Sequence, residues 1–508
     1  MALLHARNLT KSYGEINVLR GVSLDLEPKC RAALVGDNGC GKSTLLRLLA
    51  GLESPDGGVL RRSASALLLD QRKELDGAAL PEEGRQRKTE GLFSTTELPR
   101  EETASGGERM KLALSRALSG GAELLLLDEP TNDLDFDGTR QLLQLLRGYP
   151  GGVLVVSHDR YFLDQLVEVC YELEDGVLQR YQGGYSDYRR ERERRRSAAQ
   201  KRFEEERKEQ ERIRQAIRQS EAWAEKAHRQ STQADGSGLK KGKKEERRAK
   251  AKKLDRQAKA KTKRLERQLQ QAAPAPPEER RVFLRLESGG QGGRRILQAQ
   301  GLTLGYAGKP LAAGADFFLL RGERMAVFGP NGCGKSTLLH TILGRTAPLA
   351  GELWLSPGLD VGVLEQGEEG LPEGMEALAF LREMLGPVDG RARSLLHQLG
   401  LDRRHLGQRI ASLSLGERMK LKLSLLLLQG DELLLLDEPT TCLDASARDA
   451  LENALLQYGG TLLLVSHDVY FLSRLCDRCL LFEEGTLRRD EHPFAQLLSG
   501  MEEELYHK

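Results

Sequence analysis

The chain has 508 residues and nearly balanced charge, with 77 lysines and arginines against 75 aspartates and glutamates. That length gives room for two or three domains that each bury a core, and it argues against a single domain. Seven cysteines without a disulfide-framework spacing favour a reducing cytoplasmic location, and no run approaches the roughly 18 to 20 apolar residues of a membrane helix.

The first chemical motif is G-x-x-x-x-G-K-S at residues 36–43, and a second copy lies 293 positions later at 329–336. Each copy follows an apolar run that predicts a strand and precedes a segment that predicts a helix. Backbone N–H groups of such a loop enclose phosphate oxygens, the lysine reaches the outer phosphates, and the serine hydroxyl binds Mg²⁺. Two copies predict a tandem ATPase. The residues expected to hold ATP are Gly36, Asn38, Gly39, Gly41, Lys42, Ser43 and Thr44 in the first copy, and Gly329, Asn331, Gly332, Gly334, Lys335, Ser336 and Thr337 in the second.

An apolar strand that ends in acids follows each phosphate loop, because LLLLDEP occurs at residues 124–130 and again at 433–439. Its aspartate can hold Mg²⁺, and its glutamate can orient or deprotonate the water that attacks the γ-phosphate. A buried strand with solvated acids at its end would explain one copy but not an identical repeat. The predicted metal ligands are Asp128 and Asp437 together with Ser43 and Ser336, and the predicted catalytic glutamates are Glu129 and Glu438.

These motifs resemble the nucleotide-binding domains of ABC ATPases. The resemblance rests on the LLLLDEP strands, on Ser-His-Asp turns at 157–159 and 466–468, and on ASGGE at 104–108; it covers about 1–188 and 282–490. It implies an α/β fold of two tandem P-loop domains of the ABC type, each using ATP and Mg²⁺. It also implies that each ATP lies between the phosphate loop of one half and the signature of the other, so that ATP joins the halves and hydrolysis releases them.

The resemblance also implies roles for further residues in both halves. These roles are stacking on adenine for Tyr13 and Tyr306, sensing of Mg²⁺ and the attacking water for Gln71 and Gln366, contact with the γ-phosphate for His158 and His467, and signature contacts for Ser105, Gly106, Gly107, Ser414 and Gly416. Any one of them alone could be a surface aromatic or a core histidine. Their repetition in register favours two nucleotide sites.

The second signature departs from the first, because Leu415 stands where the pattern has glycine. A side chain there obstructs close approach of the backbone. The site that combines Lys42 with Ser414 is therefore expected to be the weaker or slower one. Residues 441–444 (TCLD) also differ from 132–135 (NDLD), which leaves their role at the interface open.

The segment between the halves is strongly basic. Residues 186–271 carry a net charge of +15, and the remainder of the chain carries −13. The pattern predicts two helices, at about 188–228 and 245–271, with a turn at 233–238. The second helix has a narrow apolar seam at Leu254, Ala258, Leu265 and Leu269. About 40 helical residues would extend roughly 60 Å. A solvated charged linker explains the charge pattern equally well.

Two such domains joined by basic helices resemble the ABC-F group of ABC proteins. The resemblance implies nucleotide-binding domains at 1–187 and 279–490, a helical hairpin linker at 188–278 and a short tail at 491–508. It implies a cytoplasmic monomer whose domains dimerise within the chain and which binds the ribosome in its ATP-closed form. There the hairpin would reach rRNA near the tRNA exit site, the peptidyl-tRNA and the peptidyl-transferase region. Lysine and arginine favour that partner independently, because binding an RNA backbone releases counterions.

Three functions stay open on the sequence. The first half has 34 positions from Gln71 to Ser105, against 48 from Gln366 to Ser414 in the second. This compact first half resembles ABC-F proteins that protect the ribosome against a drug directed at the peptidyl-transferase region. A housekeeping factor that rescues stalled ribosomes is the alternative. The ATPase subunit of a transporter is less favoured, because the short segment between Gln71 and Ser105 reduces the surface with which transporter ATPases bind their membrane partners.

Overall fold

The computed structural model describes residues 2–70, 75–77, 122–132, 134–233, 294–306, 308–365 and 370–506, with scattered residues between 249 and 264. It forms two compact units, one made of Met1–Tyr188 with Arg280–Lys508 and the other of Arg189–Glu279. Several predicted site residues lie outside the described part of the chain, namely Gln71, Ser105, Gly106, Gly107 and Gln366.

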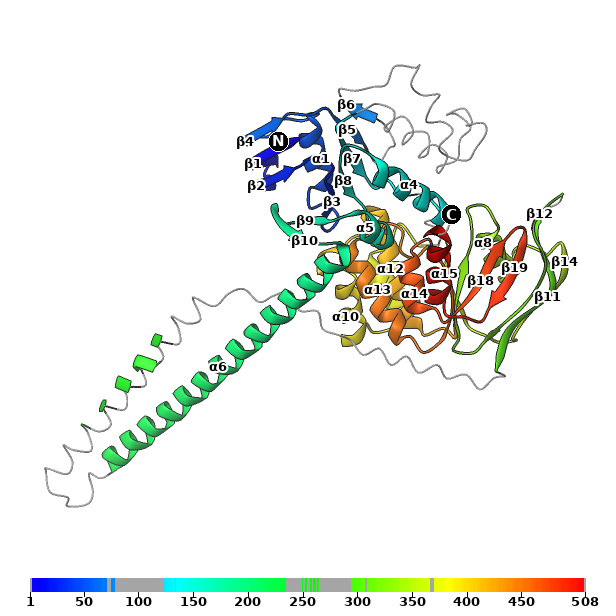
Figure 1. Cartoon of the computed structure of the whole chain (residues 1–508). Coiled ribbons are helices and arrows are strands. Elements are labelled where there is room, and N and C mark those ends of the chain that lie inside the picture. The colour runs from blue at the N-terminus through cyan, green and yellow to red at the C-terminus, as the bar shows by residue number, and fades with distance from the viewer. Residues whose placement is uncertain are drawn as a thin grey trace. The chain divides into compact units, whose positions relative to one another are not determined.

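The first half of the larger unit is an α/β domain with two sheets (Figure 1). The seven-stranded sheet has the order β10-β9-β3-β8-β7-β5-β6, and the antiparallel sheet has the order β2-β1-β4. The elements are β1 (Leu4–Tyr13), β2 (Ile16–Leu26), β3 (Arg31–Val35), α1 (Lys42–Ala50), β4 (Gly57–Arg62), β5 (Ala66–Leu69), β6 (Leu75–Gly77), β7 (Leu124–Asp128), α4 (Phe136–Gly148), β8 (Gly152–Val156), α5 (Arg160–Leu166), β9 (Val169–Glu174) and β10 (Val177–Gln182). The runs RAALV and LLLLD are buried at every position, as expected for parallel strands covered on both faces.

The second half repeats this architecture with a six-stranded sheet of order β15-β16-β17-β13-β18-β19 and an antiparallel sheet of order β12-β11-β14. Its elements are β11 (Arg295–Tyr306), β12 (Lys309–Leu320), β13 (Arg324–Phe328), α8 (Lys335–Ile342), β14 (Ala350–Leu355), β15 (Val361–Leu364), α9 (Ala377–Leu385), α10 (Gly390–Gln398), α11 (Arg403–Leu406), the 3₁₀ turn η3 (Ile410–Ser412), α12 (Leu415–Gln429), β16 (Leu433–Asp437), α13 (Ala445–Gln457), β17 (Thr461–Val465), α14 (Val469–Leu475), β18 (Arg478–Glu483), β19 (Thr486–Asp490) and α15 (Phe494–Tyr506). The predicted α/β fold class with two tandem ABC-type domains is confirmed.

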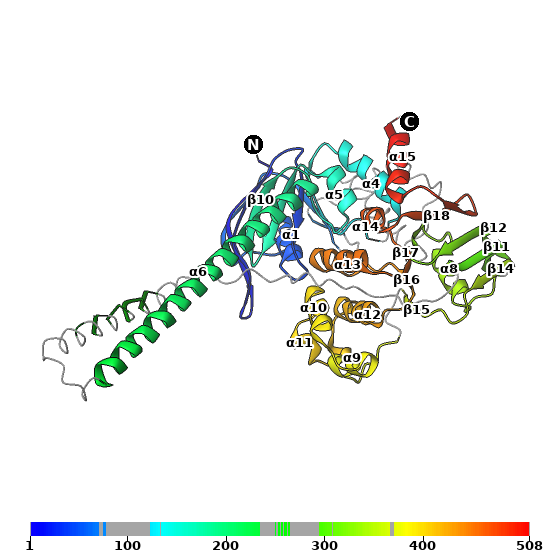
Figure 2. The ribbon, with the colours of Figure 1, turned by 90° about the horizontal axis from the view of Figure 1, so that it is seen from below.

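In each half, helices pack on both faces of the main sheet. Leucines of α1 join a core with the three-stranded sheet, while α4 and α5 pack on the opposite face. In the second half, α9, α10 and α11 occupy the longer segment before the signature, have an apolar cluster of their own, and lie beside α12 (Figure 2). The expected C-terminal tail includes α15, whose Phe494 is buried in the core of the second half. That packing gives these residues a structural role.

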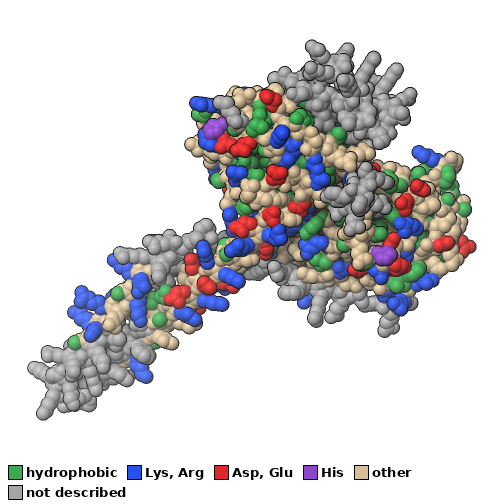
Figure 3. Space-filling model, in the orientation of Figure 1, with side chains coloured by type: hydrophobic (Ala, Val, Ile, Leu, Met, Phe, Trp, Pro, Cys, Tyr) green, Lys and Arg blue, Asp and Glu red, His purple; other side chains and the backbone are tan. Residues whose placement is uncertain are grey.

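The smaller unit contains most of the long helix α6 (Tyr185–Gln233). Its 49 residues span about 74 Å at 1.5 Å per residue, which is longer than the predicted helix. Phe203, Ile213 and Ile217 are shielded among exposed neighbours at near-heptad spacing, which is typical of a helix that packs along one stripe. The described residues between 249 and 264 are helical and exposed. Figure 3 shows many Lys and Arg side chains along the described part of this unit, with Asp and Glu between them. The predicted apolar seam at Leu254, Ala258, Leu265 and Leu269 lies outside the described residues.

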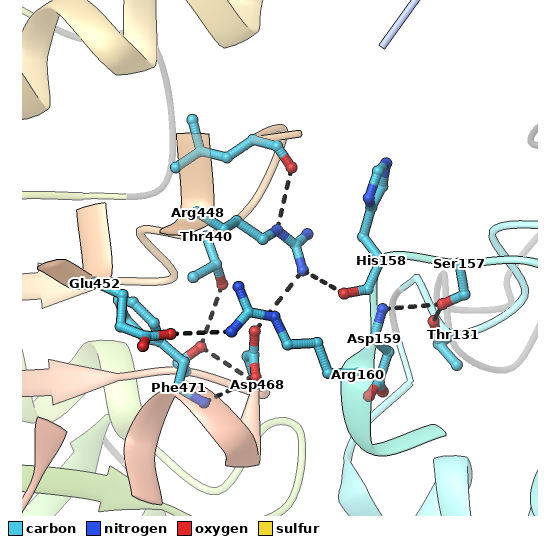
Figure 4. Close-up of polar contacts among 12 residues, drawn as sticks. Thr131, Ser157, His158, Asp159, Arg160, Thr440, Arg448, Glu452, Asp468 and Phe471 are labelled. Carbon is cyan, nitrogen blue, oxygen red and sulfur yellow. Dashed lines mark hydrogen bonds and ion pairs between the residues drawn. The ribbon is translucent and has the colours of Figure 1, made fainter. Parts of the chain in front are cut away.

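The two halves of the larger unit contact each other through buried groups. Arg160, at the start of α5, is 3% exposed and pairs with Glu452 of α13 at 2.9 Å (Figure 4). It also pairs with Asp449 of the same helix at 2.5 Å. The ring of Phe136 meets the ring of Phe328 from the second half with centroids 5.7 Å apart. No helix in the described ranges has the length and apolar composition needed to cross a membrane.

Candidate active sites at the two phosphate loops

Each phosphate loop leaves the end of a buried parallel strand and enters a helix. Gly36 follows β3 with φ +154°, and a Cβ atom there would lie 2.4 Å from the carbonyl oxygen of Leu173. Gly329 has φ +157° at the matching place, where a Cβ atom would lie 2.6 Å from Phe482. Only glycine fits between this backbone and the neighbouring strand. The loop is therefore held close to the sheet, and its helix begins at the phosphate cradle.

The lysine of each loop turns back over it. Lys42 Nζ donates to the carbonyl oxygens of Gly36 and Asp37 at 2.7 and 2.9 Å. Lys335 Nζ makes the same two bonds in its own loop, both at 2.9 Å. Both lysines are at least nine-tenths buried. A buried ammonium group at a helix N-terminus makes each loop a site for a phosphate anion.

Asp128 and Asp437 end the strands β7 and β16 beside the loops and are buried. Burial raises the pKa of both carboxyls, and hydrogen bonds from Ser43 and Ser336 oppose this rise. Ser336 Oγ donates to Asp437 Oδ2 at 2.8 Å. Among the described residues, the other oxygen of each aspartate has no hydrogen-bond partner. A buried carboxylate with a free oxygen beside a hydroxyl is the hard-oxygen donor set that suits Mg²⁺, so these residues fit the predicted metal.

The two glutamates that follow have strained backbones and buried side chains. Glu129 and Glu438 adopt the left-handed backbone conformation at φ +54° and +49°, which is disfavoured for residues other than glycine. Their N–H groups bond to the carbonyl oxygens of Val156 and Val465 at 2.8 and 2.9 Å, which holds this conformation. Burial raises the pKa of Glu129 to about 7 and that of Glu438 to about 8. Carboxyls with pKa values near neutrality are suited to proton transfer.

The predicted histidines lie beside these glutamates. His158 Nε2 lies 3.4 Å from Glu129 Oε1, and the His158 N–H donates to the other carboxyl oxygen at 3.2 Å. His467 Nε2 lies 3.6 Å from Glu438 Oε1. Burial lowers the pKa of His158 to about 3 and that of His467 to about 4, so both rings are neutral at pH 7. The structure thus brings the acids, the histidine and the phosphate loop of each half to one edge of its sheet.

The predicted adenine-stacking tyrosines are exposed at strand ends. Tyr13 ends β1 and its side chain is 47% exposed; its hydroxyl donates to Glu53 at 2.5 Å. Tyr306 ends β11, is 56% exposed, and has its hydroxyl 3.5 Å from that of Thr337. Both rings are therefore accessible to a planar ligand in the half that carries the corresponding loop.

The second signature forms the start of α12. Ser414 is the N-cap: its hydroxyl accepts from the Glu417 N–H at 3.3 Å, and the Glu417 carboxylate accepts from the Ser414 N–H at 2.8 Å. A Cβ atom on Gly416 would lie 2.8 Å from the carbonyl oxygen of Cys442. The side chain of Leu415 is 44% exposed at this helix start, where glycine would have left the backbone bare. The described residues show no hydrogen bond between Ser414 and the first phosphate loop.

Groups from each half reach the other half's site. Asp135 Oδ2 accepts from the backbone N–H of Asn331 in the second phosphate loop at 3.1 Å. A cavity of about 240 Å³ beside that loop is lined from both halves, with Phe136 on one side and Gly329 and Pro330 on the other. At the first site, Arg448 Nη1 donates to the carbonyl oxygen of His158 at 2.9 Å.

Arg160 and Arg448 are not among the predicted site residues. The signal that could have found them is the internal repeat, in which Val469 stands at the place of Arg160 and Thr139 at the place of Arg448. A charged residue present in one copy alone marks a contact that the other copy does not make.

The glycine geometry predicts which loop substitutions abolish ATP binding. Gly21 in β2 and Gly314 in β12 lie outside the loops and also have positive φ, but a Cβ atom there meets nothing within 4 Å. The double variant Gly36→Ala with Gly329→Ala should therefore lose ATP binding. The matched control, Gly21→Ala with Gly314→Ala, should keep most of it. The ATP-induced rise in unfolding temperature measures this difference, and equal losses in the two double variants would contradict it.

The raised pKa values predict a pH-dependent gain in stability when a glutamate is replaced. Each folded-state pKa lies above the ordinary 4.5, so the folded protein retains a proton that the unfolded chain releases, and stability falls as pH rises from 4.5 through about 7 or 8. Without nucleotide or Mg²⁺, Glu129→Gln and Glu438→Gln should each gain on the order of 3 kcal/mol at about pH 9 and almost nothing at about pH 4. Urea-induced unfolding at both pH values checks this; a gain independent of pH would count against it.

The exposed Leu415 predicts unequal sites. Glu438→Gln leaves only the first site with its glutamate, and Glu129→Gln leaves only the second. Turnover of ATP should be slower in the Glu438→Gln variant. Leu415→Gly in that background should raise it by up to about tenfold, equivalent to about 1.4 kcal/mol of recovered contact. Equal turnover of the two single variants, with no response to Leu415→Gly, would remove this role for the side chain.

Family models described as "ABC transporter" match this chain in three places. One matches residues 19–132 and 313–441, which include both phosphate loops and both LLLLDEP strands. A second model with that description matches residues 171–237, which include most of α6.

Relatives match nearly the whole chain. The ribosome protection protein VmlR of Bacillus subtilis is 36% identical over 95% of this chain and 87% of its own length. The tylosin resistance ATP-binding protein TlrC of Streptomyces fradiae is 34% identical over 95% of this chain and 98% of its own length. The energy-dependent translational throttle protein EttA of Mycobacterium tuberculosis is 31% identical over 94% of this chain and 90% of its own length. With both phosphate loops, both acidic strand ends and both histidine turns in place, the chain belongs to the ABC-F subfamily of ATP-binding cassette proteins and is an ATP hydrolase.

Proposed function

We propose that this ATPase works in the cytoplasm on the ribosome, which it binds in its ATP-closed form, and that it protects the ribosome against a drug directed at the peptidyl-transferase region. The observation that carries the proposal is the 36% identity to a ribosome protection protein over 95% of this chain. The relative named for tylosin resistance supports the same choice. The similarity spans both nucleotide sites and the smaller unit, Arg189–Glu279, which we call the basic unit. It therefore extends beyond the features common to all ABC ATPases.

The basic unit supports an RNA partner. Residues 186–271 carry a net charge of +15, and α6 is a continuous helix of 49 residues. A straight helix about 74 Å long can reach into a cleft as a probe, whereas a flexible tether of that composition cannot hold its tip in place. Lysine and arginine along the unit gain affinity from counterions released by the RNA backbone. We assign this unit the contacts with rRNA near the tRNA exit site and with peptidyl-tRNA.

In the proposed ATP cycle, Tyr13 and Tyr306 stack on adenine, and the phosphate loops hold the triphosphates through backbone N–H groups and the two buried lysines. The aspartate and the loop serine of each half would hold Mg²⁺, which would offset the negative charge of the triphosphate. Glu129 and Glu438 orient and deprotonate the attacking water, and the neutral histidines beside them contact the γ-phosphate. Closure of the halves within one monomer would then set the position of the basic unit.

The domain boundaries follow from this scheme. We place the first nucleotide-binding domain at 1–187, the hairpin linker at 188–278 and the second nucleotide-binding domain at 279–490. The compact smaller unit, Arg189–Glu279, supports a linker of that extent. Residues 491–508 follow the second domain.

A housekeeping role on stalled or regulated ribosomes is the second candidate, and the relative named as a translational throttle favours it. Its identity of 31% is lower than that of the ribosome protection protein, which places it second. The transporter interpretation predicts membrane subunits as partners and no affinity for ribosomes, so one binding experiment separates it from both.

Ribosome binding should depend on trapped ATP. The double variant Glu129→Gln with Glu438→Gln should bind ATP without hydrolysing it and co-sediment with 70S ribosomes when ATP is present. Adding the double variant Gly36→Ala with Gly329→Ala should abolish co-sedimentation, which controls for charge-driven binding of the basic unit. Absence of the trapped variant from the ribosome pellet would overturn the ribosomal proposal.

Protection should require the tip of the linker. Expression in a susceptible host should raise the inhibitory concentration of a drug directed at the peptidyl-transferase region. Removal of residues 228–244 should abolish this effect while ATP hydrolysis continues. Growth inhibition curves and turnover of the purified variant measure the two properties separately. Unchanged protection after the truncation would show that the linker tip is not the effector, and absence of protection by the intact protein would favour the housekeeping role.

A further inference from the structure

The turn that carries His158 is held by a side chain from the other half. Arg448, in the first turn of α13, donates through Nη1 to the carbonyl oxygen of His158 at 2.9 Å (Figure 4). Its Nε donates to the carbonyl oxygen of Leu443 at 3.1 Å, and Nη1 lies 3.8 Å from Asp468. The arginine side chain is 13% exposed. The contacts with Leu443 and Asp468, both in the second half, hold the guanidinium group in the orientation from which it bonds to the first half.

A second contact anchors the same turn to the same helix. Two residues after His158, Arg160 pairs with Glu452 at 2.9 Å and with Asp449 at 2.5 Å. Arg160 and Glu452 are each about 3% exposed, so each buried charge needs partners of opposite sign, and this ion pair supplies one for both. Residues of α13 thus contact the His158 turn at two points. One contact is a hydrogen bond to the backbone of the turn, and the other is a buried ion pair.

The equivalent contacts, from α4 of the first half to the His467 turn of the second half, cannot form with the residues at the matching positions of the repeat. Val469 occupies the place of Arg160, Thr139 that of Arg448, and Leu143 that of Glu452. A valine and a leucine carry no charge, and a threonine side chain is too short to span the gap that Arg448 bridges. A hydrogen bond that crosses between the halves at the second site, from the N–H of Asn331 to Asp135, holds the phosphate loop and not the histidine turn.

We propose that Arg448 is a positioning residue for the first nucleotide site, where it holds the His158 turn against Glu129 from the other half, and that the second site works without such a residue. The geometry supports this because the His158 N–H and imidazole both lie at the Glu129 carboxylate, 3.2 and 3.4 Å away. Release of the turn would displace both groups together. Burial raises the pKa of Glu129 and lowers that of His158, and the positive charge of Arg448 opposes the first shift and adds to the second. The inference rests on the proposed roles of Glu129 and His158 in hydrolysis and is independent of any ribosomal role.

The experiment measures each site in the background that isolates it. Arg448→Thr introduces the residue that the repeat has at this place. In the Glu438→Gln background it should lower kcat at least about tenfold with KM changed less than about twofold, a loss of about 1.4 kcal/mol in transition-state stabilisation. In the Glu129→Gln background, where only the second site retains its glutamate, turnover should change less than about twofold. Arg448→Lys, which keeps one donor, should restore part of kcat.

Two controls separate positioning from general damage. Arg474 pairs with Glu452 from within the second half, at 2.6 Å, and is 43% exposed. Arg474→Gln disturbs the same helix without touching the first half, and it should leave turnover unchanged in both backgrounds. Hydrogen exchange of the nucleotide-free protein gives a readout that needs no turnover. Arg448→Thr should speed exchange much more in residues 155–163, which lose a hydrogen bond of 2.9 Å, than in residues 464–472, where Arg448 only faces Asp468 at 3.8 Å.

Equal loss of kcat in the two backgrounds, or an equal rise of exchange in both stretches, would show that Arg448 merely stabilises the fold. Full kcat of Arg448→Thr in the Glu438→Gln background would also overturn the proposal. If neither glutamine variant turns over ATP by itself, the exchange measurement decides. All of these measurements are made without ribosomes, so a failure here is distinct from a failure to bind them.

Discussion

The parallel pairing of two buried strands in each half sets the geometry of each site. Asp128 at the end of β7 pairs with Val156 at the end of β8, and Asp437 pairs with Val465 in the same register. The residue after each aspartate therefore meets the turn after the neighbouring strand. That register brings Glu129 and the His158 turn to the same edge of the sheet, and the phosphate loop leaves that edge from β3.

Burial of Glu129 and Glu438 at this edge of each sheet lowers the stability of the fold, and it raises their pKa values into the range that suits proton transfer. The two glutamates have left-handed backbones and almost no exposed surface, and their pKa values lie near neutrality because water is excluded. Leucines of the central strands pack into apolar clusters on both faces of each sheet, and the burial of these clusters offsets the cost. The neutral histidines follow from the same exclusion of water, so one physical cause sets the protonation states of both groups.

The repeat is symmetric in its catalytic motifs and asymmetric in the contacts between its halves. Both halves have the loop, the acids and the histidine, but Arg160, Arg448 and Glu452 have no charged counterparts. Leu415 adds a difference of another kind at the second signature, where an exposed side chain replaces a bare backbone. The two differences act on the same nucleotide site: one concerns the approach of the signature, and the other the support of the histidine turn. One chain can therefore give its two sites separate tasks, although the motifs alone look alike.

The sequence by itself determined the fold class and the groups at each sheet edge. The phosphate loops, LLLLDEP and the Ser-His-Asp turns are short and contiguous, and local chemistry dictates their conformation: glycine where no Cβ atom fits, and acids where a buried strand ends. The tertiary structure alone decided which half supports which site. The pairs of Arg448 with His158 and of Arg160 with Glu452 join residues about 290 positions apart. No local pattern encodes such pairs, because they form only when two separately folded sheets meet and each buried charge must find its partner in the other half.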